Sequence, residues 1–162
     1  MKNISKHLKL KAITVIAFTL ISPSLMAQSA LTEVEIMQET FGLEKKMAVA
    51  DFMDLGEDAE SFWALYDEYE SERKKLGYDR IKVIGDYATN YADLSDEKIL
   101  ELYKRSIDTK KSFAKLQETY FNKMTKEIGV SKAAQFWQLE NYFNAMIQAE
   151  IYSQLPFIGE LD

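Results

Sequence analysis

The hydrophobic residues of this chain recur at spacings of three and four over most of its length, and this spacing predicts α-helices. The clearest stripe extends over about residues 58–91. Its members are Phe62, Tyr66, Tyr69, Arg73, Leu76, Arg80, Ile84, Tyr87 and Tyr91. Further helices are expected over about 31–52, 95–127 and 131–154, and a bend is expected near Gly77 in the helix over 58–91.

Turn-forming and capping residues separate these helices. Gly56 forms a turn before the second helix, and Ser95 is a good N-cap for the third. Gly129 ends the third helix, Ser131 caps the fourth, and Pro156 stops it. Because the connections are short, neighbouring long helices should run antiparallel. We therefore predict an all-α fold: a four-helix antiparallel hairpin or bundle with long second and third helices.

The first 27 residues have the three-part pattern of a secretory signal. Four lysines precede or adjoin an apolar stretch at 12–21, Pro23 interrupts that stretch, and small residues lead to Ala27. We expect cleavage after Ala27, with Ser29 and Ala30 as alternative sites. A retained membrane anchor is disfavoured, because a transmembrane helix needs roughly 20 apolar residues.

Cleavage after Ala27 leaves residues 28–162, which are expected to form a single helical domain in the periplasm. The removed segment carries four lysines and no acidic residue, so the net charge changes from −6 to −10. Such an acidic protein stays soluble and is poorly suited to nucleic acid or to anionic membrane surfaces. We therefore expect no nucleic-acid partner and no stable membrane anchor.

The exported chain would lack both cysteine and histidine, because the sequence has no Cys and its one histidine, His7, lies in the signal. Di-iron bundles of the ferritin kind need Glu-x-x-His pairs, and zinc sites need His or Cys. Ser71 and Ser95 each precede a lysine by three residues, but we interpret them as a surface residue and a cap. No metal, no cofactor and no catalytic residue is expected, and an enzyme that uses carboxylates alone is the remaining alternative.

Aromatic residues are abundant, since 19 of the 135 residues after the signal are Phe, Tyr or Trp. The positions of most interest are Phe62, Trp63, Tyr66, Tyr69, Phe136, Trp137 and Phe143. Two interpretations are open. These rings form the core and rim of a thin bundle, or they line a partly exposed groove that binds client chains or a second copy in a homodimer.

Four charged residues fall on or beside the apolar stripes: Arg73, Arg80, Glu140 and Glu150. A buried charge needs a partner, so we predict that an arginine of the second helix bonds Glu140 or Glu150. The alternative is that these long side chains run along the surface and keep their charged ends in water. In both cases the role of the four residues is structural.

Several short motifs are similar to those of known families. Leu94-Ser95-Asp96-Glu97-Lys98 and Leu55-Gly56-Glu57-Asp58-Ala59 stand where Spy/CpxP-like periplasmic proteins have Leu-Thr-x-x-Gln motifs. Over about Lys46 to Ile158 the chain also resembles a group of secreted bacterial helical proteins labelled as sensors or regulators. That likeness is carried by Phe62-Trp63-x-x-Tyr66-x-x-Tyr69, Tyr87 to Leu94, Gln138-Leu139-Glu140-Asn141 and Leu155-Pro156. The Spy/CpxP resemblance implies a helical, often dimeric cradle that binds unfolded clients or restrains an envelope stress sensor.

The leading hypothesis is a periplasmic protein without catalysis, an ATP-independent chaperone or envelope-stress adaptor that binds unfolded or apolar protein segments. The first alternative is a sensor or anti-signalling module that docks one specific envelope partner, and the second is the carboxylate-only enzyme. A broad exposed apolar concavity would favour the chaperone, and a small patch with a charged rim would favour the sensor. A pocket with two inward-pointing carboxylates would favour the enzyme.

Overall fold

The computed structural model describes residues 41–160. All of them belong to one compact unit, Gln38–Asp162. The expected signal, residues 1–27, and the first part of the expected helix over 31–52 lie outside the described residues.

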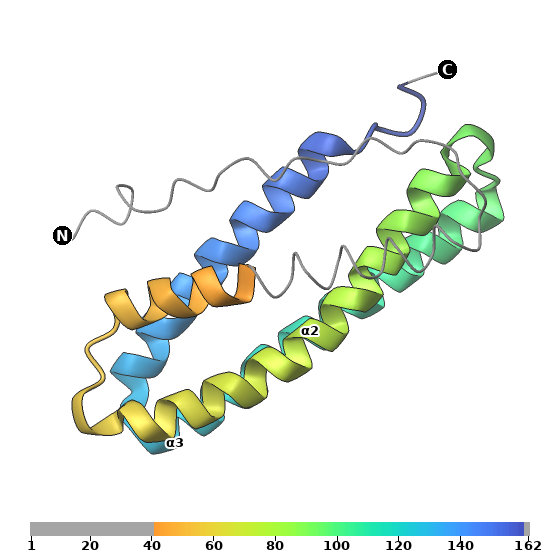
Figure 1. The fold of residues 1–162 in the computed structure, drawn as a ribbon. Coiled ribbons are helices and arrows are strands. Elements are labelled where there is room, and N and C mark those ends of the chain that lie inside the picture. The colour runs from red at the N-terminus through yellow and green to blue at the C-terminus, as the bar shows by residue number, and fades with distance from the viewer. Residues whose placement is uncertain (1–40, 161–162) are drawn as a thin grey trace. The chain divides into compact units, whose positions relative to one another are not determined.

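The described chain is built from helices joined by short turns (Figure 1). A helix over residues 41–52 is followed by η2, a 3-10 helix at Gly56–Asp58, and by α2 at Ala59–Asn90. A second 3-10 helix, η3 at Tyr91–Asp93, leads into α3 at Asp96–Gln154. No strand occurs within the described range, and the predicted all-α fold with long second and third helices is confirmed.

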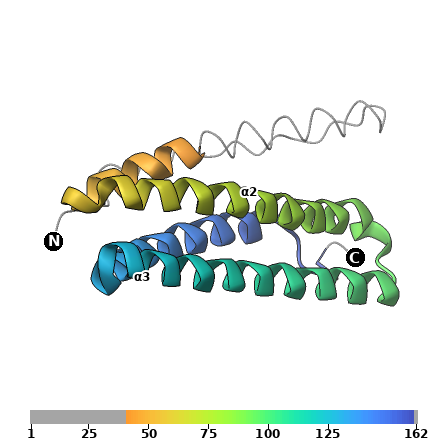
Figure 2. The same ribbon diagram turned by 90° about the horizontal axis from the view of Figure 1, so that it is seen from below.

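Gly129 divides α3 into two arms. Its φ of 80° and ψ of 157° lie in a region that glycine alone adopts readily. The chain reverses direction at this point, so that an N-terminal arm (residues 96–128) and a C-terminal arm (residues 130–154) lie beside α2 (Figures 1 and 2). The prediction that one helix ends at Gly129 and another follows is confirmed.

The N-terminal arm of α3 runs antiparallel to α2. Asp86, near the end of α2, pairs with Arg105, near the start of the arm, at 2.5 Å between Oδ2 and Nη1. Glu72, further back in α2, accepts a hydrogen bond from the hydroxyl of Tyr120, further along the arm, at 2.9 Å. The two helices therefore form the antiparallel hairpin that the short connection predicts.

The C-terminal arm runs parallel to α2. The hydroxyl of Tyr69 donates to Glu140, and the hydroxyl of Tyr87, later in α2, donates to the carbonyl of Pro156, just after the arm. Both oxygen–oxygen distances are 2.6 Å. The resulting three helical segments, α2 and the two arms, position most of the side chains discussed below.

The ends of the elements follow local sequence signals. The backbone of α2 stays helical through Gly77, so the expected bend is not present, and the bounds of α2 fall within one residue of the predicted 58–91. Ser95 caps α3 as predicted, because its Oγ accepts a hydrogen bond from the backbone N–H of Lys98 at 3.3 Å.

Buried side chains concentrate at one end of the unit. We call residues 41–73 and 116–143 the packed half and residues 74–115 and 144–160 the distal half. Buried apolar residues of the packed half are Val49, Met53, Leu55, Phe62, Tyr66, Tyr69, Leu116, Tyr120, Met124, Ile128, Ala133, Phe136, Trp137, Leu139 and Phe143. The distal half, all of it described, contributes only Leu102. Its three helical segments are therefore packed together less completely.

Candidate functional site

Six of the seven aromatic positions selected from the sequence are core residues. Phe62, Tyr69 and Phe136 are fully buried, and the same core includes Tyr66, Trp137 and Phe143. The rings of Phe62 and Phe136 meet edge to face with centroids 5.5 Å apart, and those of Tyr69 and Trp137 do so at 5.3 Å. Of the two interpretations of this aromatic set, the core applies to these six, which are not available to a client chain.

Trp63 differs from the other six because it is half-buried at the edge of the core. The ammonium group of Lys46 lies 5.2 Å from its ring centroid and pairs with Asp67 at 2.6 Å. Trp63 thus forms part of the polar rim of the packed half.

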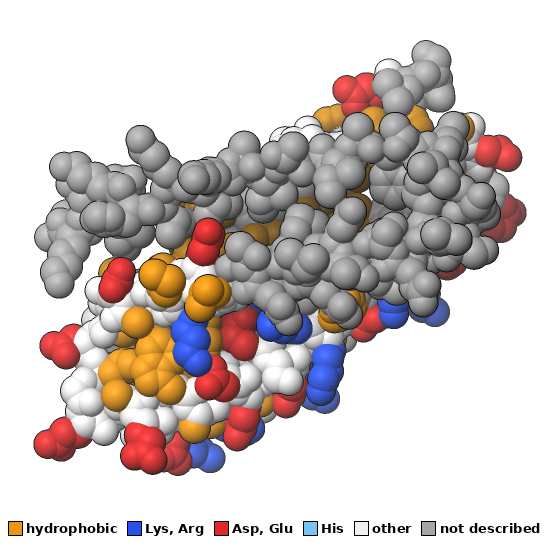
Figure 3. All heavy atoms as spheres, in the orientation of Figure 1, with side chains coloured by type: hydrophobic (Ala, Val, Ile, Leu, Met, Phe, Trp, Pro, Cys, Tyr) orange, Lys and Arg blue, Asp and Glu red, His pale blue; other side chains and the backbone are white. Residues whose placement is uncertain are grey.

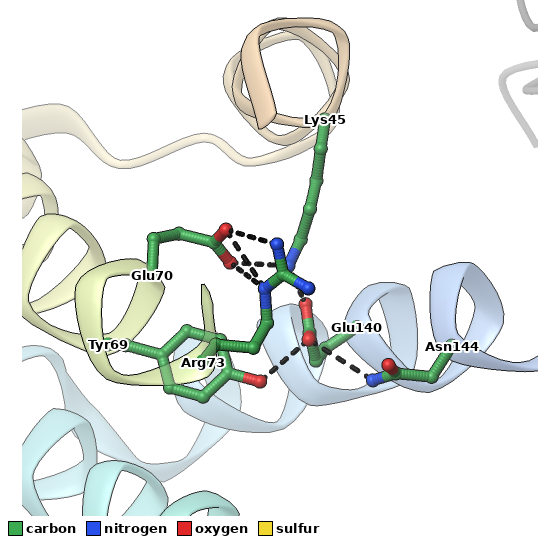
Figure 4. Close-up of polar contacts among 6 residues, drawn as sticks. All are labelled: Lys45, Tyr69, Glu70, Arg73, Glu140 and Asn144. Atoms are coloured by element: carbon green, nitrogen blue, oxygen red, sulfur yellow. Dashed lines mark hydrogen bonds and ion pairs between the residues drawn. The ribbon is translucent and has the colours of Figure 1, made fainter. Parts of the chain in front are cut away.

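A cluster of buried charges crosses the packed half (Figure 4). Lys45, from the helix over 41–52, has a side chain only 1% exposed and pairs with both Glu70 of α2 and Glu140 of α3. Arg73 donates to both oxygens of Glu70 from Nε at 3.0 Å. Glu140 also accepts from the hydroxyl of Tyr69 at 2.6 Å. Two cations and two anions thus neutralise one another and join three helices.

The electrostatics of this cluster follow from its burial and its pairing. Burial alone would raise the pKa of Glu70, but the charges of Lys45 and Arg73 outweigh it, and the pKa is lowered. Burial alone would lower the pKa of Arg73, but the carboxylate of Glu70 outweighs it and raises that pKa. The hydroxyl of Tyr69 also has a raised pKa, first because it is buried and second because it faces Glu140. These pKa shifts favour ionised Glu70, protonated Arg73 and a neutral Tyr69 hydroxyl, which are the forms that make the bonds described above.

The structure places the four charged residues differently from the sequence prediction. Arg73 and Glu140 belong to the same cluster, but the hydrogen bonds of Arg73 go to Glu70, and Lys45 occupies the position opposite Glu140. Arg73 bonds Glu70 in preference to Glu140 because Glu70 lies three residues earlier on the same helix face. Glu150 is exposed, and its carboxylate accepts a hydrogen bond from Nε2 of Gln154 at 3.4 Å.

Sequence reasoning missed Lys45 and Glu70. The spacing of Glu70 and Arg73 was a usable signal, since residues three apart on a helix face each other. Lys45 carried no such signal, because its partners are 25 and 95 positions away along the chain. Only the packing of the helix over 41–52 against both other helices brings it to them.

A cavity of about 430 Å³ lies in the distal half, between α2 and the two arms of α3. This volume is within the ~300–1,000 Å³ typical of ligand pockets. Its lining residues are Arg80, Val83, Ile84, Ser106, Thr109, Lys110, Phe113, Ala114, Gln117, Asn141, Asn144, Ala145, Gln148, Ile151 and Tyr152. Arg80 therefore lies in the cavity wall, and its guanidinium carbon is 4.3 Å from the ring centroid of Phe113.

The cavity and the charge cluster meet at Asn144. This side chain lines the cavity and donates from Nδ2 to Glu140 at 3.1 Å (Figure 4). The charge cluster of the packed half therefore holds one side chain of the cavity lining in place.

Apolar side chains are also exposed on the helix over 41–52. They belong to Leu43, Met47 and Phe52, and Figure 3 shows apolar side chains over this helix and the start of α2, interspersed with acidic and basic ones. These side chains lie on a single helix, whereas the cavity is lined by three helical segments. The cavity is for that reason the better candidate for a binding site.

Within residues 41–160 no three His, Cys, Asp or Glu side chains gather as a metal site would require. No helix in that range combines the length and apolar character needed to cross a bilayer. The two buried carboxylates, Glu70 and Glu140, are each bonded to cations within the charge cluster and do not line the cavity.

Comparison of the chain with protein-family models, with curated proteins and with solved structures finds no match.

Proposed function

We propose that the protein acts by binding and performs no chemical reaction, as an ATP-independent chaperone or stress adaptor of the periplasm that holds apolar segments of client proteins. One observation carries the proposal: the distal half leaves an unfilled cavity of about 430 Å³ between three helical segments. Folding normally fills such space with side chains, because close packing is stabilising. The lining includes Val83, Ile84, Phe113 and Ile151, and an apolar group that packs against these side chains gains by leaving water.

The site of client binding differs from the one that the aromatic stripe suggested. The rings of Phe62, Tyr66 and Phe136 are buried in the core and stabilise the fold. The distal half, by contrast, exposes Leu100 at 67% and Tyr152 at 57%, and Tyr152 also lines the cavity. We therefore assign client binding to the distal half.

Suppression of aggregation tests this function. The exported chain, mixed at equimolar ratio with an unfolding reporter enzyme, should delay light scattering by the reporter. Ala145 is exposed and lines the cavity, so Ala145→Trp should fill the space and abolish the protection. Ala88, exposed on α2 and away from the cavity lining, is the matched control, and Ala88→Trp should protect as the unaltered chain does. Equal loss, or no protection by the unaltered chain, would exclude the chaperone.

A second candidate function, docking to one envelope partner, is favoured by the segment after α3. The hydroxyl groups of Tyr87 and Tyr91 donate to the carbonyls of Pro156 and Phe157 at 2.6 Å each. This fixes the segment on the end of α2, while the side chain of Phe157 is 77% exposed and that of its neighbour Ile158 is 60% exposed. A small apolar surface held in this way suits one partner. If this function is correct, the unaltered chain should retain one envelope protein in a pull-down experiment, and Phe157→Ser should lose it. The unaltered chain should then not suppress aggregation of the reporter enzyme.

A further inference from the structure

The cavity is positively charged within an acidic protein. The whole chain has a net charge of −6, yet its cavity is lined by Arg80 and Lys110 and, among the described residues, by no Asp or Glu. Any carboxylate of the chain would neutralise these cations if it lay in the wall. Within residues 41–160 this positive charge is unmatched and lies beside apolar surface, which is the complement of an anion attached to an apolar body.

Arg80 is the residue on which this argument rests. Its two counterparts each have a carboxylate partner: Arg73 pairs with Glu70 at 2.9 Å, and Arg105 pairs with Asp86 at 2.5 Å. No carboxylate of the described chain pairs with Arg80, whose guanidinium group instead rests on the ring of Phe113. Burial lowers the pKa of Arg80, and the positive charge of Arg73 lowers it further. A half-buried arginine without a counter-ion is costly unless a ligand supplies one.

The rest of the lining indicates what kind of body carries the anion. Val83, Ile84 and Ile151 supply apolar surface, and Asn141 and Gln148 supply neutral donors and acceptors of hydrogen bonds. Both amide side chains are exposed and bond water in the free protein, and a hydrocarbon chain would displace that water without replacing its hydrogen bonds. A peptide satisfies them with its own backbone N–H and C=O groups.

From these features we infer that the cavity receives the apolar C-terminal end of a client polypeptide, with the terminal carboxylate on Arg80 and Lys110. This inference rests on the proposed function and makes it specific. A chain end places a carboxylate directly beside apolar side chains, and the polypeptide continues on one side only. An internal acidic residue would have to bring chain into the cavity on both sides. Guanidinium is also the group that binds a carboxylate through two parallel hydrogen bonds.

The test uses one peptide in two forms. A fluorescein-labelled hexapeptide with the sequence Gly-Ser-Gly-Leu-Val-Phe is made with a free C-terminal carboxylate and with a C-terminal amide. Binding to the exported chain is measured by fluorescence anisotropy. The free acid should bind about 10- to 100-fold more tightly than the amide, as expected for charge-assisted hydrogen bonds.

Variants of the cavity cations locate the effect. Arg80→Met keeps an unbranched apolar contact with Phe113 and should lose most of the preference for the acid. The double variant Arg80→Met with Lys110→Met removes both cations of the lining and should bind acid and amide equally, at the affinity of the amide. Arg80→Lys keeps the charge without the planar fork and should retain part of the preference. Lys75 is exposed on the same helix and does not line the cavity, so Lys75→Met removes one positive charge and should retain the full preference. Thermal unfolding, monitored by circular dichroism, verifies that each variant is folded.

Each result decides the inference. Equal binding of acid and amide by the unaltered chain would overturn it, while the proposed function would stand if reporter aggregation is still suppressed. Binding of neither form, together with no suppression, would remove the proposed function as well. Dodecanoate, a fatty acid with a single carboxylate, is tested in the same way. If dodecanoate binds and neither peptide does, the inference is overturned in favour of a small amphiphilic carboxylate.

Discussion

Replacing Lys45 by methionine should destabilise the protein strongly. The side chain of Lys45 is 1% exposed, and it is the cation that connects Glu70 of α2 with Glu140 of α3. Methionine fills a similar volume but carries no charge. The buried cluster of two cations and two anions would become one cation and two anions, with Glu140 left facing an apolar side chain.

The size of the effect follows from this burial. Removing one partner of a buried ion pair costs about 3–5 kcal/mol, because the remaining charge stays desolvated. Glu140 is in that position here, since its side chain is 1% exposed, whereas Glu70 keeps its pair with Arg73. For a domain of this size each kcal/mol lowers the melting temperature by about 3–5 °C, so a loss of roughly 10–20 °C is expected.

Urea unfolding monitored by circular dichroism at the helical bands measures this loss, and Lys46 supplies the control. Lys46 is next in sequence and also pairs with a carboxylate of α2, Asp67, but its side chain is 42% exposed. Lys46→Met should therefore cost only about 0.5–1.5 kcal/mol, from an exposed pair and its cation–π contacts. Adding Glu140→Gln to Lys45→Met should restore at least about 1 kcal/mol, because it removes the charge that was stranded. Equal losses for the two lysine variants would refute the claim that the cluster is a buried structural core.

Three further predictions concern individual groups. The pKa of Glu70 is lowered in the folded protein, so ionised Glu70 stabilises the fold at pH values above its ordinary pKa of 4.5. This stabilisation should be lost as the pH falls through the lowered pKa, and unfolding free energies measured at a series of acidic pH values would detect the loss. Gly129→Ala should cost about 1–3 kcal/mol, since φ is +80° there, whereas Gly85→Ala, in open space within α2, should stabilise by about 0.5–1 kcal/mol. Tyr69→Phe should cost about 1.5–3 kcal/mol by removing a hydrogen bond to a carboxylate. Tyr66→Phe should be neutral or stabilising, because that hydroxyl is buried without a hydrogen-bond partner, and denaturant midpoints compare the two.

The fold could be predicted because its determinants are local. A stripe of residues three and four apart produced α2 almost to the residue, and Ser95 and Gly129 marked where helices begin and end. Gly77 was misleading, since a glycine inside a helix lowers its propensity, yet packing on both sides can hold the backbone straight. The resemblance to Spy/CpxP-like proteins stays a prediction.

The candidate site could be predicted only in part, because its determinants are contacts between distant segments. Arg73 and Arg80 occupy equivalent places in one stripe, seven residues apart, and look alike in the sequence. Their surroundings differ: Arg73 has Glu70 three residues earlier, whereas Arg80 has Gly77 in that place. That difference could have shown that Arg80 lacks a local partner. The cavity beside it could not have been seen, because its walls come from three segments whose packing the periodicity does not specify.

The division into a packed half and a distal half explains how one small unit can be stable and still keep a cavity. Aromatic packing and the neutralised charge cluster hold the three helical segments together at one end, so the other end need not bury its side chains to remain folded. Stability and binding should then respond to different substitutions. Lys45→Met should lower the melting temperature but, below that temperature, leave the preference for a free C-terminal carboxylate unchanged. Arg80→Met should remove most of the preference and leave the melting temperature unchanged or raised, since it removes a half-buried charge that has no counter-ion in the described chain. If both substitutions altered both properties together, the two halves would be one cooperative site, and the assignment of carboxylate binding to Arg80 and Lys110 would fail.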